Sequence, residues 1–169
     1  MVAIRPTRKL RSALPVTQVV GLPDTALGDW YANRFVVGRQ PLLLLVSSAS
    51  LLPILVRARR VCELPNHLED MVACRLARLG IATPLIEAER RAMRPVRIGP
   101  TVDRSVLGIM ADFANSVPYY LKARGLGDSA LIGIENRLAE TPCYAGKASD
   151  RVVFPDRMAL QLLVAKWAG

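Results

Sequence analysis

A long apolar run broken by turn residues constrains the fold most. The run from Leu42 to Val56, LLLLVSSASLLPILV, spans 15 residues and is interrupted by three serines and by Pro53. A membrane-spanning helix needs about 20 apolar residues, so the run is too short and too broken to cross a bilayer. Short apolar runs bounded by turn residues indicate buried strands. Together with the preceding GDWYANRFVVGRQP, the pattern predicts an antiparallel meander with strands near 30–37, 41–47 and 51–58.

The rest of the chain is mostly helical in pattern. A short strand is predicted over residues 2–5 and another over 95–99. Helices are predicted over 64–79, 84–93, 103–122, 128–139 and 155–167. This order favours an α+β fold, in which an antiparallel β-meander from the N-terminal third is packed by helices from the C-terminal two thirds. The length of 169 residues fits one domain, residues 1–169.

Residues 15–27 contain Pro, Gly, Thr and Asp without periodicity, which predicts a mobile loop. The N-terminal MVAIRPTRKLR carries charges where a signal peptide needs its apolar segment, which predicts a cytoplasmic protein without a membrane partner.

The cysteines give no sign of a metal or redox site. Cys62, Cys74 and Cys143 are odd in number and not closely paired, and His67 is the only histidine. We expect the first two to lie on the core side of the helix over 64–79. No metal and no cofactor is predicted, and a Cys/His nucleophilic pair with His67 stays open without support from the spacing.

Positive charge is concentrated in the first third of the chain. The formal net charge is +9, and residues 1–60 hold nine basic and two acidic residues. Such an excess predicts salt-dependent association with polyanions, with nucleic acid as the first candidate. Arg5, Arg8, Lys9 and Arg11 lie within seven residues and form either a solvated surface or a phosphate-facing cluster.

The segment VDRSVLGIMADFANSV is predicted to be an amphipathic helix with a narrow polar stripe. At 100° per residue the stripe contains Arg104, Gly108, Asp112 and Asn115. Asp103 is the predicted N-cap. A mid-helix glycine costs about 1 kcal/mol relative to alanine, so Gly108 predicts a notch occupied by a ligand or by a neighbouring element.

The segment GDWYAN is the second candidate site. Strand alternation places Asp29, Tyr31 and Asn33 on one face, and Trp30 and Ala32 on the other. A carboxylate, a phenol and an amide in a row either bind a polar ligand or satisfy backbone groups at a turn. The chain contains no phosphate loop, zinc-binding His-Glu-x-x-His, nucleophile elbow or calcium loop.

These motifs resemble those of an uncharacterised bacterial family, a domain of unknown function of about this length. The likeness covers RxTxKL (Arg5, Thr7, Lys9, Leu10), GDWYAN (Gly28–Asn33), RSVLGxMxDF (Arg104–Phe113), and Leu138, Pro142, Phe154 and Pro155. This chain has Ser47 and Ser48 where relatives have Thr-Asn, and no site is placed there. The resemblance implies an accessory gene without an assigned activity, and it marks these positions: Arg5, Thr7, Lys9, Asp29, Trp30, Asn33, Arg104, Ser105 and Asp112.

Three hypotheses follow. The first is a module that binds nucleic acid or a phosphorylated ligand through the Arg-rich N-terminal third, with ligand contacts from Arg5, Thr7, Lys9, Trp30, Asn33, Ser105 and Gly108. The second is an enzyme acting on a nucleotide or nucleic acid, with Asp29 or Asp112 as the base and Arg5 or Arg104 stabilising negative charge. The third is a protein–protein inhibitor or antitoxin-like factor whose basic face meets an acidic protein.

Overall fold

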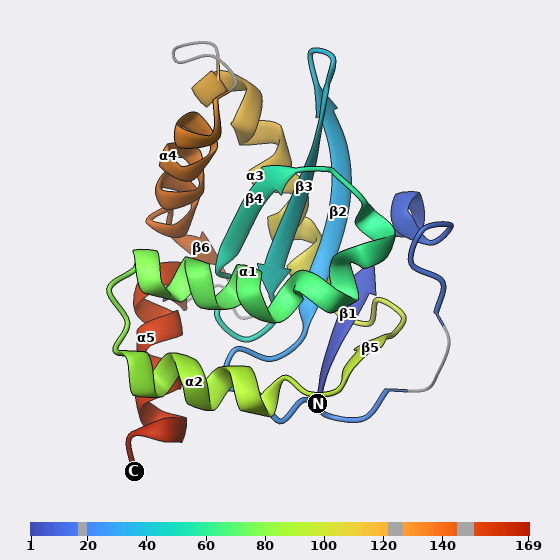
Figure 1. Ribbon diagram of the computed structural model, residues 1–169. Helices are drawn as coiled ribbons and strands as arrows, with labels where there is room; N and C mark the ends of the chain where they lie inside the picture. The colour runs from blue at the N-terminus through green and yellow to red at the C-terminus, as the bar shows by residue number, and fades with distance from the viewer. Residues whose placement is uncertain (17–19, 122–126, 145–150) are drawn as a thin grey trace.

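The computed structural model describes residues 1–16, 20–121, 127–144 and 151–169 (Figure 1). It confirms the α+β class and the meander. In chain order the elements are β1 (Val2–Pro6), η1 (Arg8–Leu10), β2 (Trp30–Val37), β3 (Gln40–Ser47), β4 (Pro53–Arg57), η2 (Val61–Glu63), α1 (Leu64–Arg78), α2 (Thr83–Ala92), β5 (Val96–Ile98), α3 (Arg104–Leu121), α4 (Asp128–Ala139), β6 (Cys143–Tyr144), β7 (Val152–Val153) and α5 (Pro155–Trp167).

The main sheet has the strand order β4-β3-β2-β1-β5. Strands β2, β3 and β4 form the predicted antiparallel meander. The pairing of β1 is parallel on both sides, with β2 and with β5, and the sequence did not indicate it. Because β3 is antiparallel to both β2 and β4, strands β1, β2 and β4 all point in the same direction.

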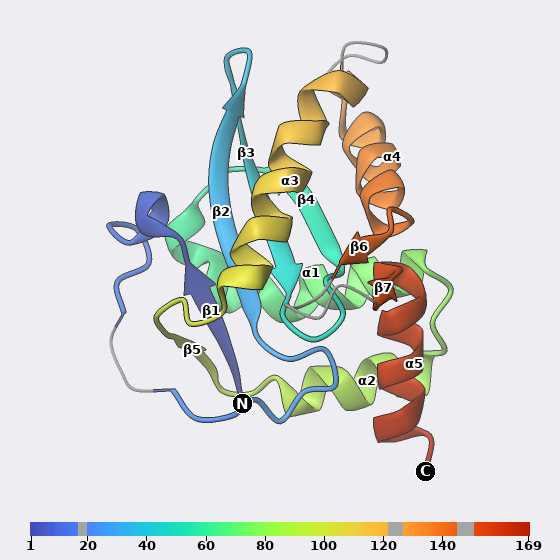
Figure 2. The same ribbon diagram turned by 180° about the vertical axis from the view of Figure 1, so that it is seen from behind.

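Helices cover both faces of this sheet. On one face α1, α2 and α5 close a core around Trp30, Leu43 and Leu45. On the other face α3 and α4 close a second core around Tyr31, Leu44 and Phe113. Figure 1 shows α1 in front of the strands with α2 below them, and the reverse view in Figure 2 shows α3 in front of the strands with α4 at its side.

The unbroken apolar run of β3 follows from this arrangement. A strand inside a sheet that is covered on both faces needs apolar side chains at every position. Leu43 and Leu45 belong to the first core, while Leu42, Leu44 and Val46 belong to the second. In the described part of the chain, no helix has the length and apolarity that a membrane crossing requires.

The start of α3 is capped as predicted. Asp103 Oδ1 accepts hydrogen bonds from the backbone N–H of Ser105 at 2.8 Å and from its hydroxyl at 2.6 Å. These bonds, the hydroxyl first, hold the pKa of the Asp103 carboxyl below its ordinary value. The carboxylate therefore satisfies helix donors that would otherwise have no partner.

The prediction of a mobile loop over residues 15–27 is wrong for its last part. Thr25, Ala26 and Leu27 are buried. The carboxylate of Glu89 on α2 accepts the N–H groups of Ala26 at 2.8 Å and of Leu27 at 2.9 Å, which fixes this segment against the helix. Residues 17–19 of the predicted loop lie outside the described residues.

The expected core position of two cysteines is also wrong, because Cys62 and Cys74 are exposed. On α1 the buried residues Leu68, Val72 and Leu76 recur every four positions. Cys74 stands two positions, about 200°, from both Val72 and Leu76 and therefore lies on the outer side.

A buried carboxylate joins α1, α4 and the edge strand β4. Glu135 is fully buried; its Oε1 lies 3.1 Å from Arg75 and 2.6 Å from Arg78, and its Oε2 accepts the N–H of Leu55 at 2.8 Å. Arg75 is also fully buried, and burial lowers its pKa. The pair therefore satisfies an outward N–H of the sheet edge and neutralises a guanidinium inside the fold.

We predict that Glu135→Ala lowers the free energy of unfolding by about 3 to 5 kcal/mol, because it leaves the buried Arg75 charge without its counterion. Urea unfolding followed by circular dichroism measures the change. Glu140→Ala, an exposed acid at the end of the same helix, is the control and should stay within about 0.5 kcal/mol of the unmodified chain. Equal effects of the two substitutions would contradict the assigned role.

Candidate functional site

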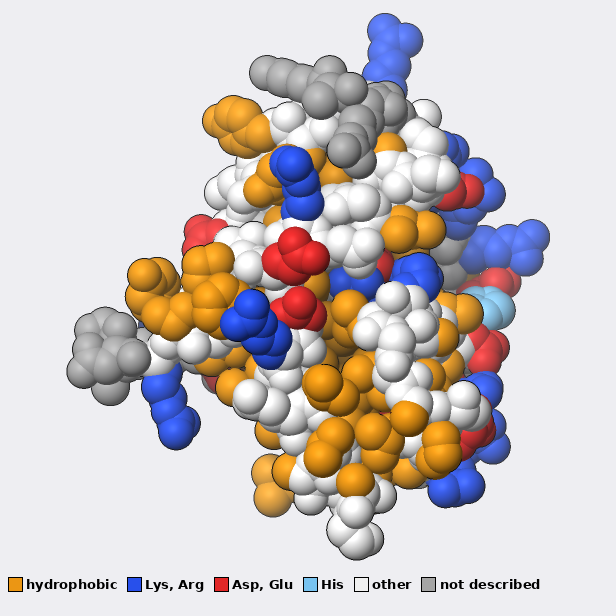
Figure 3. Space-filling view, turned by 90° about the vertical axis from the view of Figure 1, so that its left-hand side faces the viewer, with side chains coloured by type: hydrophobic (Ala, Val, Ile, Leu, Met, Phe, Trp, Pro, Cys, Tyr) orange, Lys and Arg blue, Asp and Glu red, His pale blue; other side chains and the backbone are white. Residues whose placement is uncertain are grey.

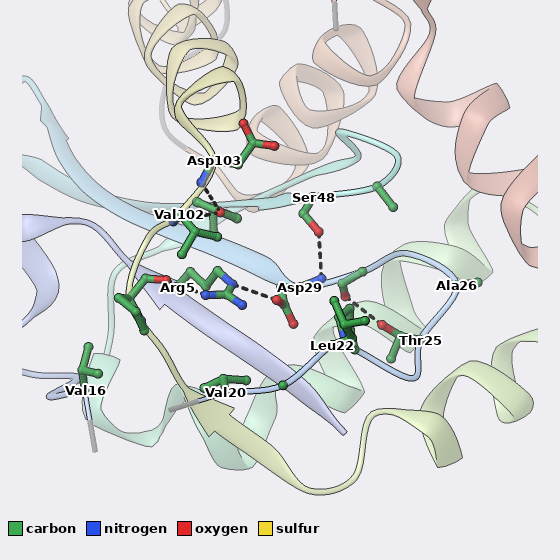
Figure 4. Close-up of a pocket in the computed structure, with 16 residues that line it drawn as sticks. Arg5, Val16, Val20, Leu22, Thr25, Ala26, Asp29, Ser48, Val102 and Asp103 are labelled. Carbon is green, nitrogen blue, oxygen red and sulfur yellow. Dashed lines mark hydrogen bonds and ion pairs between the residues drawn. The ribbon is translucent and has the colours of Figure 1, made fainter. Parts of the chain in front are cut away.

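A large cavity lies where β1, β2 and the segment leading into α3 meet. Its volume is about 1120 Å³. We call it the Arg5–Asp29 pocket, after the ion pair in its wall (Figure 4). Its polar lining comes from Arg5, Thr25, Asp29, Tyr31, Ser48 and Asp103, and its apolar lining includes Val16, Val20, Leu22, Ala49 and Val102.

The ion pair is short and buried. Arg5 Nε donates to Asp29 Oδ2 at 2.7 Å, and the two side chains are 9% and 6% exposed. Asp29 Oδ1 accepts the N–H of Ala3 at 2.8 Å, and Arg5 Nη1 donates to the carbonyl of Pro100 at 2.6 Å. Both carboxylate oxygens are therefore already engaged, which makes Asp29 a poor candidate for the general base that the sequence proposed.

Gly28 and Ser48 fix the position of Asp29. Gly28 has φ of +76°, and a Cβ added there would collide with Ser48 Oγ and lie 3.2 Å from the backbone N of Ala49. Ser48 Oγ accepts the N–H of Asp29 at 2.9 Å, and the N–H of Ser48 donates to the carbonyl of Asp29 at 2.8 Å. The serine turn, where the sequence placed no site, thus supplies a wall of the pocket.

One hydroxyl of the GDWYAN strand contacts the two residues that precede the RSVLGxMxDF motif. Tyr31 Oη accepts the N–H of Val102 at 3.3 Å and the N–H of Asp103 at 2.9 Å. This contact ties the GDWYAN strand to the start of α3. Asp103 lines the pocket, whereas the predicted residues Arg104, Ser105 and Gly108 do not.

Two other predicted ligand residues line a separate cavity of about 570 Å³ between β2 and α3. Lys9 and Asn33 lie there with Asn115 and Tyr119 of α3. Thr7 stands at the N-cap position of η1, but its hydroxyl donates to Asn33 Oδ1 at 2.8 Å and does not cap the turn. Thr7, Lys9 and Asn33 therefore form a group apart from Arg5 and Asp29.

The structure does not unite the predicted catalytic residues. Asp29 is buried beside Arg5, while Arg104 and Asp112 are exposed on α3 and stand eight residues apart, about 12 Å along the helix axis. Asp112 lines a third cavity, of about 240 Å³, with Cys143 and Tyr144. Asp29, Arg104 and Asp112 therefore do not form one active site.

Two further predictions are wrong: the ligand contact of Trp30 and the occupied notch at Gly108. Trp30 is 0% exposed and packs in the core under α1, so its ring contacts side chains and no ligand. Gly108 is exposed, and no described atom lies within 4 Å of a Cβ added to it, so no neighbouring element occupies the predicted notch.

Basic side chains collect where three strands end. Strands β1, β2 and β4 point the same way, and each leads into basic residues. Of the nine basic residues in the first sixty, six are exposed and form no ion pair with a described residue. We call these six the basic edge: Arg8, Lys9, Arg11, Arg34, Arg39 and Arg59. The face over α4 and α5 differs, since Figure 3 shows acidic and basic side chains interspersed there, with hydrophobic ones gathered below.

Among the described residues, no group of three His, Cys, Asp or Glu side chains is arranged to hold a metal ion. The Cys143 thiol donates to the carbonyl of Thr141 at 3.4 Å. Burial, and then the charge of Asp112, raise the pKa of Cys143 to about 11. The thiol is therefore an inert, protonated group at neutral pH.

Residues 3–158 match the model of a protein family described as a domain of unknown function (DUF6933). The matched residues include Arg5 and Asp29 of the pocket wall and all six residues of the basic edge. No curated protein matches the chain.

We predict opposite effects for two glycine substitutions. Gly108→Ala should raise the free energy of unfolding by up to about 1 kcal/mol, because its Cβ has room and alanine favours the helix. Gly28→Ala should lower it by more than about 1 kcal/mol, because a left-handed φ and the Ser48 contact both resist a side chain. Thermal and urea unfolding measure both. A destabilising Gly108→Ala would mean that an unseen neighbour does occupy that face.

We also predict that iodoacetamide at about pH 8 labels Cys62 and Cys74 much faster than Cys143, since only the thiolate reacts and the buried thiol stays protonated. Mass spectrometry of timed samples gives the order of labelling. Unfolding in urea should abolish the difference, and rapid labelling of Cys143 in the folded chain would contradict its burial.

Proposed function

The chain belongs to the family described as a domain of unknown function (DUF6933), and we propose that it binds nucleic acid through the basic edge. The observation that carries the proposal is the common direction of β1, β2 and β4, which brings basic residues far apart in sequence to one end of the sheet.

The charge of this edge is not neutralised from within the N-terminal third. That third has two acids, and both are engaged elsewhere. Asp24 binds the amino group of Met1 at 2.8 Å, and Asp29 binds Arg5. Arg8 and Arg11 are therefore left with solvent or an external anion as their partner, as far as the described residues show.

The spacing of the cations favours a polymer over a single phosphate. The six side chains are distributed over η1, the β2–β3 hairpin and the segment after β4, and only Lys9 and Arg59 line any described cavity. A row of separate cations matches successive backbone phosphates, whereas one phosphate group requires convergent donors. Contacts of this kind set affinity and orientation without reading sequence.

The test is fluorescence anisotropy with a labelled oligonucleotide of about 20 nucleotides, from about 50 to 200 mM salt. We expect affinity to fall steeply with salt. Arg8→Ala/Arg11→Ala should weaken binding and reduce the slope of log K against log salt by roughly 1.4 to 1.8, the value for two lost phosphate contacts.

The matched control is Arg91→Ala/Arg151→Ala, which removes the same charge from exposed positions on α2 and before β7. It should leave the slope nearly unchanged. Equal weakening by both double variants would show non-localised attraction by net charge, and absence of binding at low salt would overturn the proposal.

A further inference from the structure

We propose that the Arg5–Asp29 pocket binds a small carboxylate that carries an apolar body. This site is separate from the basic edge, because none of the six side chains of the basic edge lines the pocket. The inference therefore does not depend on nucleic-acid binding.

The first indication is a guanidinium donor of the pocket wall that is available to a ligand. Arg5 Nε and Nη1 have partners, in Asp29 and Pro100. Its remaining terminal nitrogen, Nη2, has no acceptor among the described residues, and it is not one of their buried unpaired atoms, so it faces the water of the pocket. A guanidinium N–H that faces the water of a pocket can donate to an oxygen of a bound molecule, and a bond to a charged acceptor is stronger than one to a neutral acceptor.

Two hydroxyls add donors to the same wall. Tyr31 Oη and Ser48 Oγ accept backbone N–H groups, from Val102 and Asp103 in one case and from Asp29 in the other. Each hydroxyl keeps its own hydrogen for a further bond. Because both oxygens of Asp29 are engaged, the polar groups left for a ligand are mainly donors, and they select a head group that accepts.

The charge around the pocket sets how negative that head group can be. The charge of Arg5 is balanced by Asp29, and Asp103 stands at the margin. The positive end of α3 and the net charge of +9 attract an anion, while the two carboxylates oppose a second negative charge. These opposing effects favour a singly charged carboxylate over a phosphate dianion.

Exposed apolar side chains at the mouth of the pocket indicate that the ligand has an apolar part. Leu22 is 89% exposed, Val102 is 69% exposed and Val16 is 43% exposed. Figure 4 shows all three around the ion pair. Apolar side chains gathered at a concave site bury their surface when a ligand with an apolar part enters. A free organic acid and the carboxyl end of a peptide share this chemistry.

The test is a ¹H–¹⁵N NMR titration of the full chain with phenylacetate, up to about 20 mM, because a probe of this size binds in the millimolar range. We expect saturable shifts of the Val102, Asp103 and Ser48 amides. Phenyl phosphate should bind more weakly and benzyl alcohol should give no saturation. Tighter binding of phenyl phosphate, or shifts confined to the basic edge, would overturn the proposal.

Acetyl-Leu-Phe and its C-terminal amide separate the two sources of the carboxylate. If the free acid binds at least about tenfold more tightly than phenylacetate and the amide does not bind, the occupant is a peptide end. Comparable binding of both acids identifies a small organic acid. Binding of the amide as strong as that of the acid would exclude a carboxylate head group.

Two substitutions report on the site. Tyr31→Phe removes one donor and should weaken phenylacetate binding roughly tenfold, while Tyr119→Phe, the same change outside this pocket, should have no effect. Leu22 lies at the exposed margin, where Leu22→Glu should weaken phenylacetate binding and Leu22→Lys should not. This pair of variants tests the site even if Tyr31→Phe destabilises the fold. Equal binding by both Leu22 variants would contradict the site, and unchanged binding by Arg8→Ala/Arg11→Ala would support it.

Discussion

The buried ion pair between Arg5 and Asp29 organises the centre of the molecule. It joins β1 to the residue that precedes β2, and the second oxygen of Asp29 continues the pairing by accepting the N–H of Ala3. Two charges withdrawn from water are stable only with good geometry and further hydrogen bonds, and this pair has both. Without it, β1 would lose the contact that fixes its register against β2, and β5, which pairs only with β1, would lose its place in the described sheet.

The same device recurs at two other places in the fold. Glu89 accepts the N–H groups of Ala26 and Leu27 and the indole N–H of Trp167, and Glu135 accepts the N–H of Leu55 at the sheet edge. In each case a buried carboxylate satisfies backbone donors that lie outside a regular ladder. These acids look like ordinary surface residues of amphipathic helices in the sequence, because the backbone donors that they bind come from segments more than sixty residues away.

Local patterns predicted the local structure. The two-sided burial of β3, the alternation of Trp30 and Tyr31 between the two cores and the cap at Asp103 follow from spacing alone. The register of the hairpin was also within reach. The two-residue turn at Gly38 and Arg39 pairs Val37 with Gln40, and counting back places Ser48 opposite Asp29. The parallel pairing of β1 could not be predicted, because long connections separate β1 from β2 and β5. Local periodicity carries no information about such distant partners.

The direction of β1 determines the chemistry of both proposed sites. Parallel to β2, it brings Arg5 beside Asp29, and it points toward the same end of the sheet as β2 and β4 although it stops opposite Ala32. One arginine of the basic motif is thereby neutralised within the pocket wall, while Arg8 and Arg11, which follow the strand, remain at the surface with their charge. An antiparallel β1 would separate these residues differently and place η1 at the opposite edge. A cluster that looks uniform in the sequence therefore becomes two places of different character, a nearly neutral pocket rich in donors and an open positive edge.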